Sequence, residues 1–300
     1  MRVRLVLLVV AAGCGRLGYE HGAPGDGGAG QPDASQADAA SLPPFGEAAA
    51  IPGLSDPNAD DDPSLTGDLL ELYFKSNRGG MNDFDIWRAR RDTTDQPWAD
   101  PVQVDELSTK SFEATPEVSL DGLTITFASD RTGGGGGGVD LWISTRLTRD
   151  DPWDPPEPLA ALNTTADEFA AVTDEGGQRI VFNRMVVDHS YDLFQAVLAG
   201  ADWGDPVALV NLSSAAYEAD SHLDPGGLEL YFAGELADAE GRDIYRTRRG
   251  DPGADFDAPE RIAELATAGA DEDPWVSPDR RLIVFSSDRS GDQELYTASR

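Results

Sequence analysis

The chain has 300 residues, of which 40% are hydrophobic, with six Trp, seven Tyr and eleven Phe. This content is enough for a core and suits β-strands better than a helical bundle. Acidic residues number 55 and basic residues 23, so the net charge is −32. Such a surface repels phosphate backbones, which argues against nucleic acid as a partner, while it favours solubility and weak cation binding.

Residues 1–14 have the three-part pattern of a bacterial lipoprotein signal. Arg2 and Arg4 form a basic start, LVLLVV over residues 5–10 is a short apolar stretch, and small residues precede Cys14. The apolar stretch is too short to span a bilayer as a helix. The pattern predicts a signal peptide over residues 1–13, cleavage before Cys14 and lipidation of that cysteine, with a plain secretory signal as the alternative.

This pattern predicts a protein of the bacterial cell envelope whose membrane contact is the lipid on Cys14. We expect the anchor in the outer membrane and the folded body in the periplasm or at the surface. Cys14 is the only cysteine, so no intrachain disulfide can form. Residues 15–43 are rich in Gly, Ala, Asp, Pro and Ser, so residues 14–43 are predicted to be the lipidated cysteine and a disordered tether.

From residue 44 onward the chain repeats one pattern five times. Each unit begins with an aromatic residue, a leucine follows nine positions later, and a phenylalanine follows twenty positions after that. The aromatics are Phe45, Trp98, Trp153, Trp203 and Phe256. The leucines are Leu54, Leu107, Leu162, Leu212 and Leu265. The phenylalanines are Phe74, Phe127, Phe182, Phe232 and Phe285. A spacing kept this strictly predicts five copies of one structural unit.

Each unit has the pattern of four short strands separated by turns. The segments that end at the repeated phenylalanine are apolar or alternate, as in LTITF and LELYF, and turn residues follow them. An acid, an aliphatic and an aromatic residue then begin a further strand, as in DIW at residues 85–87. Repeated five times, this pattern predicts an all-β fold, a β-propeller with one four-stranded blade per unit.

The combined motifs resemble the WD40-like Pro-Asp repeats of TolB-type β-propellers. The second unit contributes FEATPEVSLDGLTITFASDRTGGGGGGVDLWIST and the last unit DEDPWVSPDRRLIVFSSDRSGDQELYTASR. The resemblance covers residues 44–300 and implies a propeller over that range. It implies little about function, because one fold can serve many roles.

Five units predict five blades, whereas TolB-type propellers usually have six, so a six-bladed or incomplete ring is the alternative. The last unit ends after its third strand. Residues 44–55 carry Phe45 and Leu54 at the spacing of a fourth strand, and no preceding unit needs them. We therefore predict that this N-terminal strand completes the last blade and closes the ring.

Each unit also carries an acid at the predicted start of its innermost strand, so five carboxylates should ring one mouth of the central channel. These acids are Asp60, Glu113, Glu168, Glu218 and Asp271. An arginine follows the repeated phenylalanine in four units. These arginines are Arg78, Arg131, Arg184 and Arg289. We expect each acid either to pair with its arginine for packing or to contribute to a cation or ligand site at the mouth.

The fourth unit departs from this pattern, because AGE at residues 233–235 stands where other units lead to an arginine. Glu218, Asp220 and Glu235 would then lack the usual arginine, and His222 lies near the same strand. We expect any ligand site on this blade, formed by these four residues and able to hold Ca²⁺ through its carboxylates. Drift in one repeat is the alternative, and no other cofactor is expected.

Two functions are consistent with these patterns. The first is a non-catalytic envelope protein that binds a protein, a peptide or a glycan at one face of the propeller. The second is a glycoside-acting enzyme with acids in the central funnel. A glycosidase needs two carboxylates in unequal environments at a defined separation, whereas here the acids recur in every unit, which favours the non-catalytic interpretation.

Overall fold

The computed structural model describes residues 42–54, 58–80, 84–187, 190–214, 217–236 and 241–300. The predicted signal, Cys14 and nearly all of the predicted tether lie outside these ranges. One compact unit spans Pro44–Arg300. Its described residues form strands and turns, and they include no helix long and apolar enough to cross a membrane.

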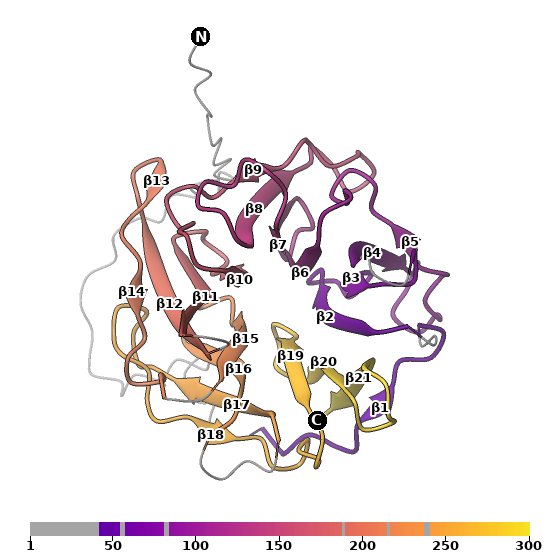
Figure 1. Cartoon of the computed structure of the whole chain (residues 1–300). Coiled ribbons are helices and arrows are strands. Elements are labelled where there is room, and N and C mark those ends of the chain that lie inside the picture. The colour runs from indigo at the N-terminus through magenta and orange to yellow at the C-terminus, as the bar shows by residue number, and fades with distance from the viewer. Residues whose placement is uncertain (1–41, 55–57, 81–83, 188–189, 215–216, 237–240) are drawn as a thin grey trace, which may run out of the picture. The chain divides into compact units, whose positions relative to one another are not determined.

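Five antiparallel sheets stand around a central channel as the blades of a β-propeller (Figure 1). In each blade the chain starts at the channel and moves outward strand by strand. Blade 1 contains β2 (Asp60–Leu65), β3 (Glu71–Ser76), β4 (Asp85–Arg90) and β5 (Val102–Gln103). Blade 2 contains β6 (Glu113–Val118), β7 (Thr124–Ser129), β8 (Asp140–Thr145) and β9 (Glu157–Pro158).

Blade 3 differs from the others at its outer edge. It contains β10 (Glu168–Thr173), β11 (Arg179–Val187), β12 (Ser190–Ala199), β13 (Asp202–Trp203) and β14 (Val207–Ala208). Its β12 is ten residues long, so it pairs with both β13 and β14. Blade 4 returns to four strands, which are β15 (Glu218–Leu223), β16 (Glu229–Gly234), β17 (Asp243–Arg248) and β18 (Glu260–Arg261).

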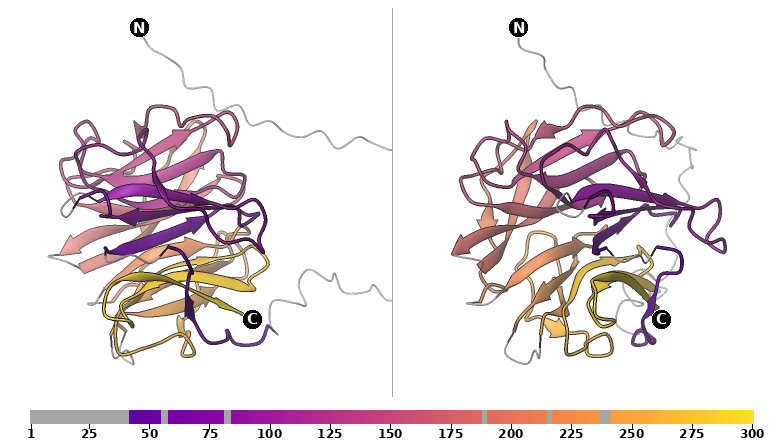
Figure 2. Two further views of the ribbon diagram at one scale, coloured as in Figure 1. Left: turned by 90° about the vertical axis from the view of Figure 1, so that its right-hand side faces the viewer. Right: turned by 45° about the vertical axis from the view of Figure 1, so that its right-hand side comes forward.

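Blade 5 combines strands from the two ends of the compact unit Pro44–Arg300. It contains β19 (Asp271–Val276), β20 (Leu282–Ser287), β21 (Glu294–Ser299) and, at its outer edge, β1 (Ala49–Ala50). Ala49 pairs with Thr297, and the Gly46 N–H donates to the Ser299 carbonyl at 2.8 Å. Figure 2 shows β1 beside β21 from the side. The prediction of five blades closed by the N-terminal strand is confirmed, and the six-bladed and incomplete alternatives are wrong.

In four of the five units, an arginine after the third strand explains the aromatic residue that opens the unit. Arg146 stacks on Trp153 at 4.3 Å, and its Nε donates to the Gly122 carbonyl at 2.6 Å. The same stacking recurs in three more blades, in the pairs Arg91–Trp98, Arg249–Phe256 and Arg300–Phe45. Each of these arginines stands six residues after the first residue of the third-strand triplet, so this contact also follows the repeat. The cation–π contact holds the outermost segment against its blade.

The six-glycine run of blade 2 is closely packed at three of its positions, Gly134, Gly136 and Gly138. A Cβ added at Gly136 would lie 1.2 Å from the Thr164 carbonyl oxygen of the neighbouring loop, and one at Gly134 would lie 2.1 Å from Asp140. Only residues without side chains allow this approach. The run therefore serves a close contact between blades 2 and 3.

Candidate functional site

The five repeated acids are enclosed within their blades and do not line an open mouth. Each begins its innermost strand, and each is at most 1% exposed. Four form ion pairs with the repeated arginines of their own blade. The pairs are Asp60–Arg78 at 2.6 Å, Glu113–Arg131 at 2.9 Å, Glu168–Arg184 at 2.7 Å and Asp271–Arg289 at 2.6 Å.

Further hydrogen bonds show that these ion pairs hold each blade together. In blade 2, the Thr109 N–H and hydroxyl donate to Glu113 at 2.8 and 2.7 Å, and Ser129 donates at 2.9 Å. Arg131 also donates to the carbonyl of the repeated Leu107, and its guanidinium lies 4.8 Å from the Phe127 ring. A buried ion pair with this many partners is a structural element rather than a ligand site.

The fourth blade replaces the arginine with an apolar residue. Leu236 stands at the arginine position and packs against the cluster that contains Phe232 and Tyr245. Glu218 keeps the hydrogen bonds from the N–H and hydroxyl of Ser214, and burial raises its pKa. Within the described residues Glu218 forms no ion pair with an arginine, as its sequence context predicted.

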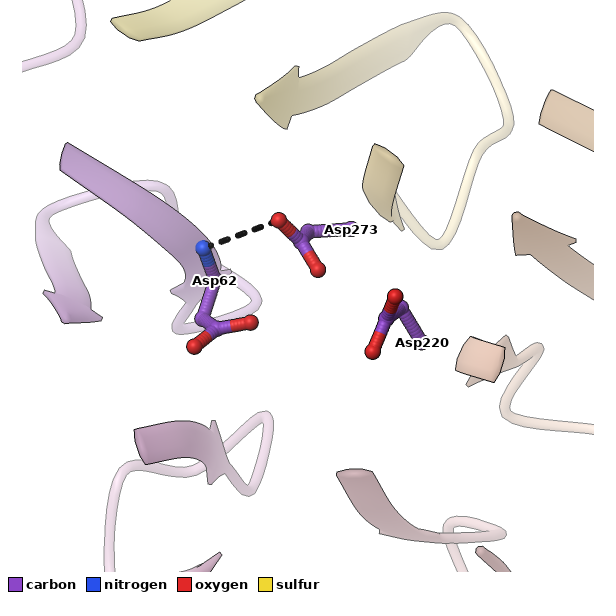
Figure 3. Close-up of side chains that lie close together, drawn as sticks. All are labelled: Asp62, Asp220 and Asp273. Carbon is purple, nitrogen blue, oxygen red and sulfur yellow. Dashed lines mark hydrogen bonds between the residues drawn. The ribbon is translucent and has the colours of Figure 1, made fainter. Parts of the chain in front are cut away.

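The four residues predicted as a ligand site on this blade are not brought together. Glu235 lacks the usual repeat arginine, but it is exposed and pairs at 3.0 Å with Arg242, which directly precedes β17. His222 is 5% exposed and packs against Trp275, and burial lowers its pKa to about 4. Of the four, only Asp220 is among the residues that line the small central pocket, and Figure 3 shows it near Asp62 and Asp273. The placement of these residues does not support a calcium site made from all four.

The residues that face the channel stand two positions after each repeated acid. They are Asp62, Thr115, Ala170, Asp220 and Asp273, with φ angles between +45° and +54°. This left-handed conformation costs a residue other than glycine about 1–2 kcal/mol. Bonds between blades offset part of that cost. The Thr115 N–H donates to Asp62 at 3.0 Å, and the Ala170 N–H donates to the Thr115 hydroxyl at 3.0 Å.

Three of these residues form an acidic cluster, which we define as Asp62, Asp220 and Asp273. They come from blades 1, 4 and 5 and point toward one another, with one carboxylate oxygen of each within 4.8 Å of the others (Figure 3). The Asp62 N–H donates to Asp273 at 3.3 Å. Lys75 Nζ lies 3.1 Å from Asp62 and 3.0 Å from Asp61, and the Tyr217 hydroxyl donates to Asp220 at 2.7 Å.

The cluster holds carboxyl groups whose negative charge is poorly compensated. Burial, together with Glu272 and Asp62, raises the pKa of Asp220 to about 7. Burial and the charges of Asp62 and Asp220 raise the pKa of Asp273 well above its usual range. Burial alone would lower the pKa of Lys75, but the attraction of Asp61 and Asp62 outweighs it and raises that pKa. Carboxylates of like charge at this distance disfavour ionisation of one another.

We expect Asp220→Asn to gain stability relative to the wild type as the pH rises from about 4 to about 7. In this window the unfolded chain has released the proton that folded Asp220 still holds, since its pKa rises from 3.8 to about 7 on folding. The wild type therefore loses unfolding free energy as the pH rises, and asparagine removes that loss. Urea denaturation at both ends of the window should show the difference changing by at least about 1.4 kcal/mol. A constant difference would contradict the raised pKa.

Five aromatic rings form a continuous arc at the mouth where the innermost strands begin. The aromatic arc comprises Phe84, Phe112, Phe169, Tyr191 and Tyr217, and all five rings are partly exposed. Successive rings meet edge to face with centroids 5.8–6.4 Å apart. Lys75 Nζ lies 5.3 Å from Phe84 at one end, and the Arg242 guanidinium lies 4.1 Å from Tyr217 at the other.

The aromatic arc is not part of the repeat. Phe112 and Tyr217 directly precede their innermost strands, and the three other blades have Ala59, Asp167 and Ala270 at this position. Blade packing therefore does not require aromatic residues there. The repeat pattern gives no sign of the arc, because its members occupy three different positions of the unit.

The channel, the acidic cluster and the aromatic arc belong to a five-bladed β-propeller whose fold has known relatives. No family model matches the chain, and no curated protein matches it. Among solved structures, a thermostable family-43 glycoside hydrolase matches with a TM-score of 0.57 and 11% identity, covering 84% of this chain and 91% of that one. The catalytic domain of the Coprinopsis cinerea GH62 α-L-arabinofuranosidase matches with a TM-score of 0.56 and 13% identity, covering 85% and 96%.

TolB from Acinetobacter baumannii matches with a TM-score of 0.51 and 13% identity. The alignment covers 82% of this chain but only 56% of the TolB chain. TolB-like propellers and glycoside hydrolase propellers are thus both structural neighbours of this protein. At these identities the similarity establishes the fold and not the activity.

Proposed function

We propose that this protein is a non-catalytic lipoprotein of the bacterial cell envelope, whose WD40-like, TolB-like propeller binds a protein, a peptide or a glycan at the mouth of its channel. The aromatic arc is the observation that carries this proposal. Partly exposed aromatic residues at the centre of a surface supply much of the binding energy in protein interfaces. Cys14 and its signal pattern support the anchoring, and loss of lipid labelling in Cys14→Ser tests that part.

Removing two rings of the aromatic arc should weaken binding without unfolding the propeller. Aromatic anchors in interfaces contribute about 2 kcal/mol or more, so Phe112→Ala with Tyr191→Ala should reduce capture of the envelope ligand at least tenfold. The measurement is capture from envelope extract, followed by titration of whatever is captured. The matched control is Val207→Ala, a 67% exposed residue on the outer edge of blade 3. Equal capture by wild type and double variant would contradict the proposal.

A glycoside-acting enzyme is the second candidate, and the acidic cluster is the observation that favours it. Retaining glycosidases hold their two carboxyl groups about 5–5.5 Å apart, and inverting ones about 6.5–9.5 Å apart. The cluster brings one carboxyl oxygen of each residue within 4.8 Å of the others, and the pocket it borders has a volume of only about 10 Å³. Ligand pockets usually measure about 300–1,000 Å³, so the cluster leaves little room for a sugar between two carboxyl groups.

Hydrolysis assays separate these two functions. Arabinan, xylan and fructan oligosaccharides should remain intact in the presence of the protein. Release of sugar that Asp220→Asn abolishes would make the protein an enzyme and overturn the non-catalytic function.

A further inference from the structure

The mouth of the channel is apolar on one side and charged on the other. The aromatic arc extends over blades 1 to 4, with Phe112 and Phe169 in its middle. The rest of the mouth belongs to blades 4, 5 and 1, whose innermost strands β15, β19 and β2 adjoin one another (Figure 1). These three strands contribute the mouth carboxylates, which are Asp61, Asp62, Asp220, Glu272 and Asp273.

Two cations compensate part of this charge. Lys75 pairs with Asp61 and Asp62, and Arg242 pairs with Glu272 at 2.7 Å. Within the described part of the chain, Asp220 and Asp273 form no ion pair, and both are partly exposed. The charged side of the mouth therefore has five acidic side chains against two basic ones.

We propose that the ligand at this mouth is a segment of another protein that carries a lysine or arginine next to apolar side chains. Its cationic group faces Asp220 and Asp273, and its apolar side chains lie on the aromatic arc. This inference rests on the proposed function and specifies the class of partner. Charge complementarity selects the occupant, because a cation beside these acidic side chains is attracted to them, whereas a neutral or anionic group is not.

Other occupants fit these charges less well. A neutral glycan supplies no charge to offset the carboxylates, and an acidic glycan is repelled by them. A second copy of this chain carries the same net charge of −32 and is repelled as well. An apolar peptide would use the arc and leave the charged side of the mouth without a partner.

Binding of a cationic ligand should also change the protonation of the acidic cluster. Asp220 has a pKa of about 7 in the free protein, so part of its population is protonated at neutral pH. A ligand ammonium or guanidinium group favours the ionised form and lowers that pKa. The complex should therefore form with release of protons, which calorimetry detects as a binding heat that depends on the buffer.

The test uses a displayed library of random peptides selected on the full-length protein. We expect the recovered peptides to be enriched in lysine or arginine beside aromatic or aliphatic residues. The best peptide is then synthesised with its cationic residue intact and with norleucine in that place. Charge-assisted hydrogen bonds contribute about 1.5–3 kcal/mol, so norleucine should weaken binding at least tenfold.

A paired variant assigns the effect to the acidic cluster. In Asp220→Asn with Asp273→Asn, the norleucine change should have little effect, because the carboxylates that recognise the cation are gone. Glu260→Gln, a 74% exposed side chain on blade 4, is the matched control and should retain the full tenfold loss. Thermal melts of each variant confirm that it folds, and removal of like charges should not destabilise the pair.

The outcomes distinguish this inference from the function on which it rests. Recovered peptides without cationic enrichment, or a norleucine peptide that binds the wild type equally well, would overturn the inference. Calcium chloride that binds the cluster alone and displaces the peptide would also overturn it, since the cluster would then hold an ion. If Phe112→Ala with Tyr191→Ala leaves peptide binding unchanged, the proposed function itself is wrong.

Discussion

Deletion of residues 44–55 is expected to unfold the propeller. The segment supplies β1 and three buried side chains, which are Phe45, Ile51 and Leu54 at 4%, 5% and 2% exposure. Phe45 also stacks under Arg300 at 4.2 Å and donates its N–H to Glu264 at 2.9 Å. Replacing a buried phenylalanine with alanine costs about 3–5 kcal/mol. Because domains unfold with a free energy of about 5–15 kcal/mol, Phe45→Ala alone should remove a large part of the free energy of unfolding.

Circular dichroism and chemical denaturation measure this effect. Deletion of residues 15–43 is the matched control, and we expect it to leave the melting temperature unchanged. A ring that loses its closing strand exposes the edge of blade 5 and the cores on both sides of it. Equal melting temperatures for the two deletions would contradict the closure.

Replacing Arg131 with methionine is expected to lower the unfolding free energy by about 3–5 kcal/mol, because it leaves a buried carboxylate without its cation. Glu113, its partner at 2.9 Å, is fully buried. Methionine keeps most of the side-chain volume between Phe127 and Trp142, so the loss reports the charge more than the packing. Urea denaturation of the folded domain measures the change.

Two further variants sharpen this experiment. Arg246→Met removes an ion pair whose acid, Glu260, is 74% exposed, and should cost no more than about 1 kcal/mol. Arg131→Met combined with Glu113→Gln should recover part of the loss, because no charge is left buried. Blade 4 has the arrangement of the single variant, since Leu236 replaces the arginine beside Glu218, and burial raises the pKa of that carboxyl group. A similar loss of unfolding free energy in Arg131→Met and Arg246→Met would show that the buried ion pair stabilises the fold no more than the exposed one.

Contacts within one blade could be predicted from spacing alone. Asp60 and Arg78 are 18 residues apart in one hairpin, and Glu113–Arg131 and Asp271–Arg289 repeat that separation. A separation that recurs in several units identifies a contact that each unit makes by itself. The repeat was misleading only about exposure, because it indicates which residues occupy the same position and not which way that position faces.

The sites formed between blades could not be predicted from the spacing within one unit. Asp62 and Asp273 are 211 residues apart, and they meet because the ring closes. The left-handed backbone at Asp220 and its counterparts forms a β-bulge that turns these side chains toward the channel. The alternation of polar and apolar residues along a strand does not predict where such a bulge occurs. A search of the positions two residues after each acid would have found Asp62, Asp220 and Asp273 as a group.

The aromatic arc is a second feature that depends on contacts between blades and not on the repeat within one blade. Its rings come from four blades and from three positions of the unit, so no alignment of the repeats groups them. The repeat spacing was sufficient to predict the propeller, the five blades, the closing strand and the acid–arginine pairs, because each follows from local pattern copied along the chain. The acidic cluster and the arc exist only after closure, because a ring brings the starts of five distant strands to one mouth.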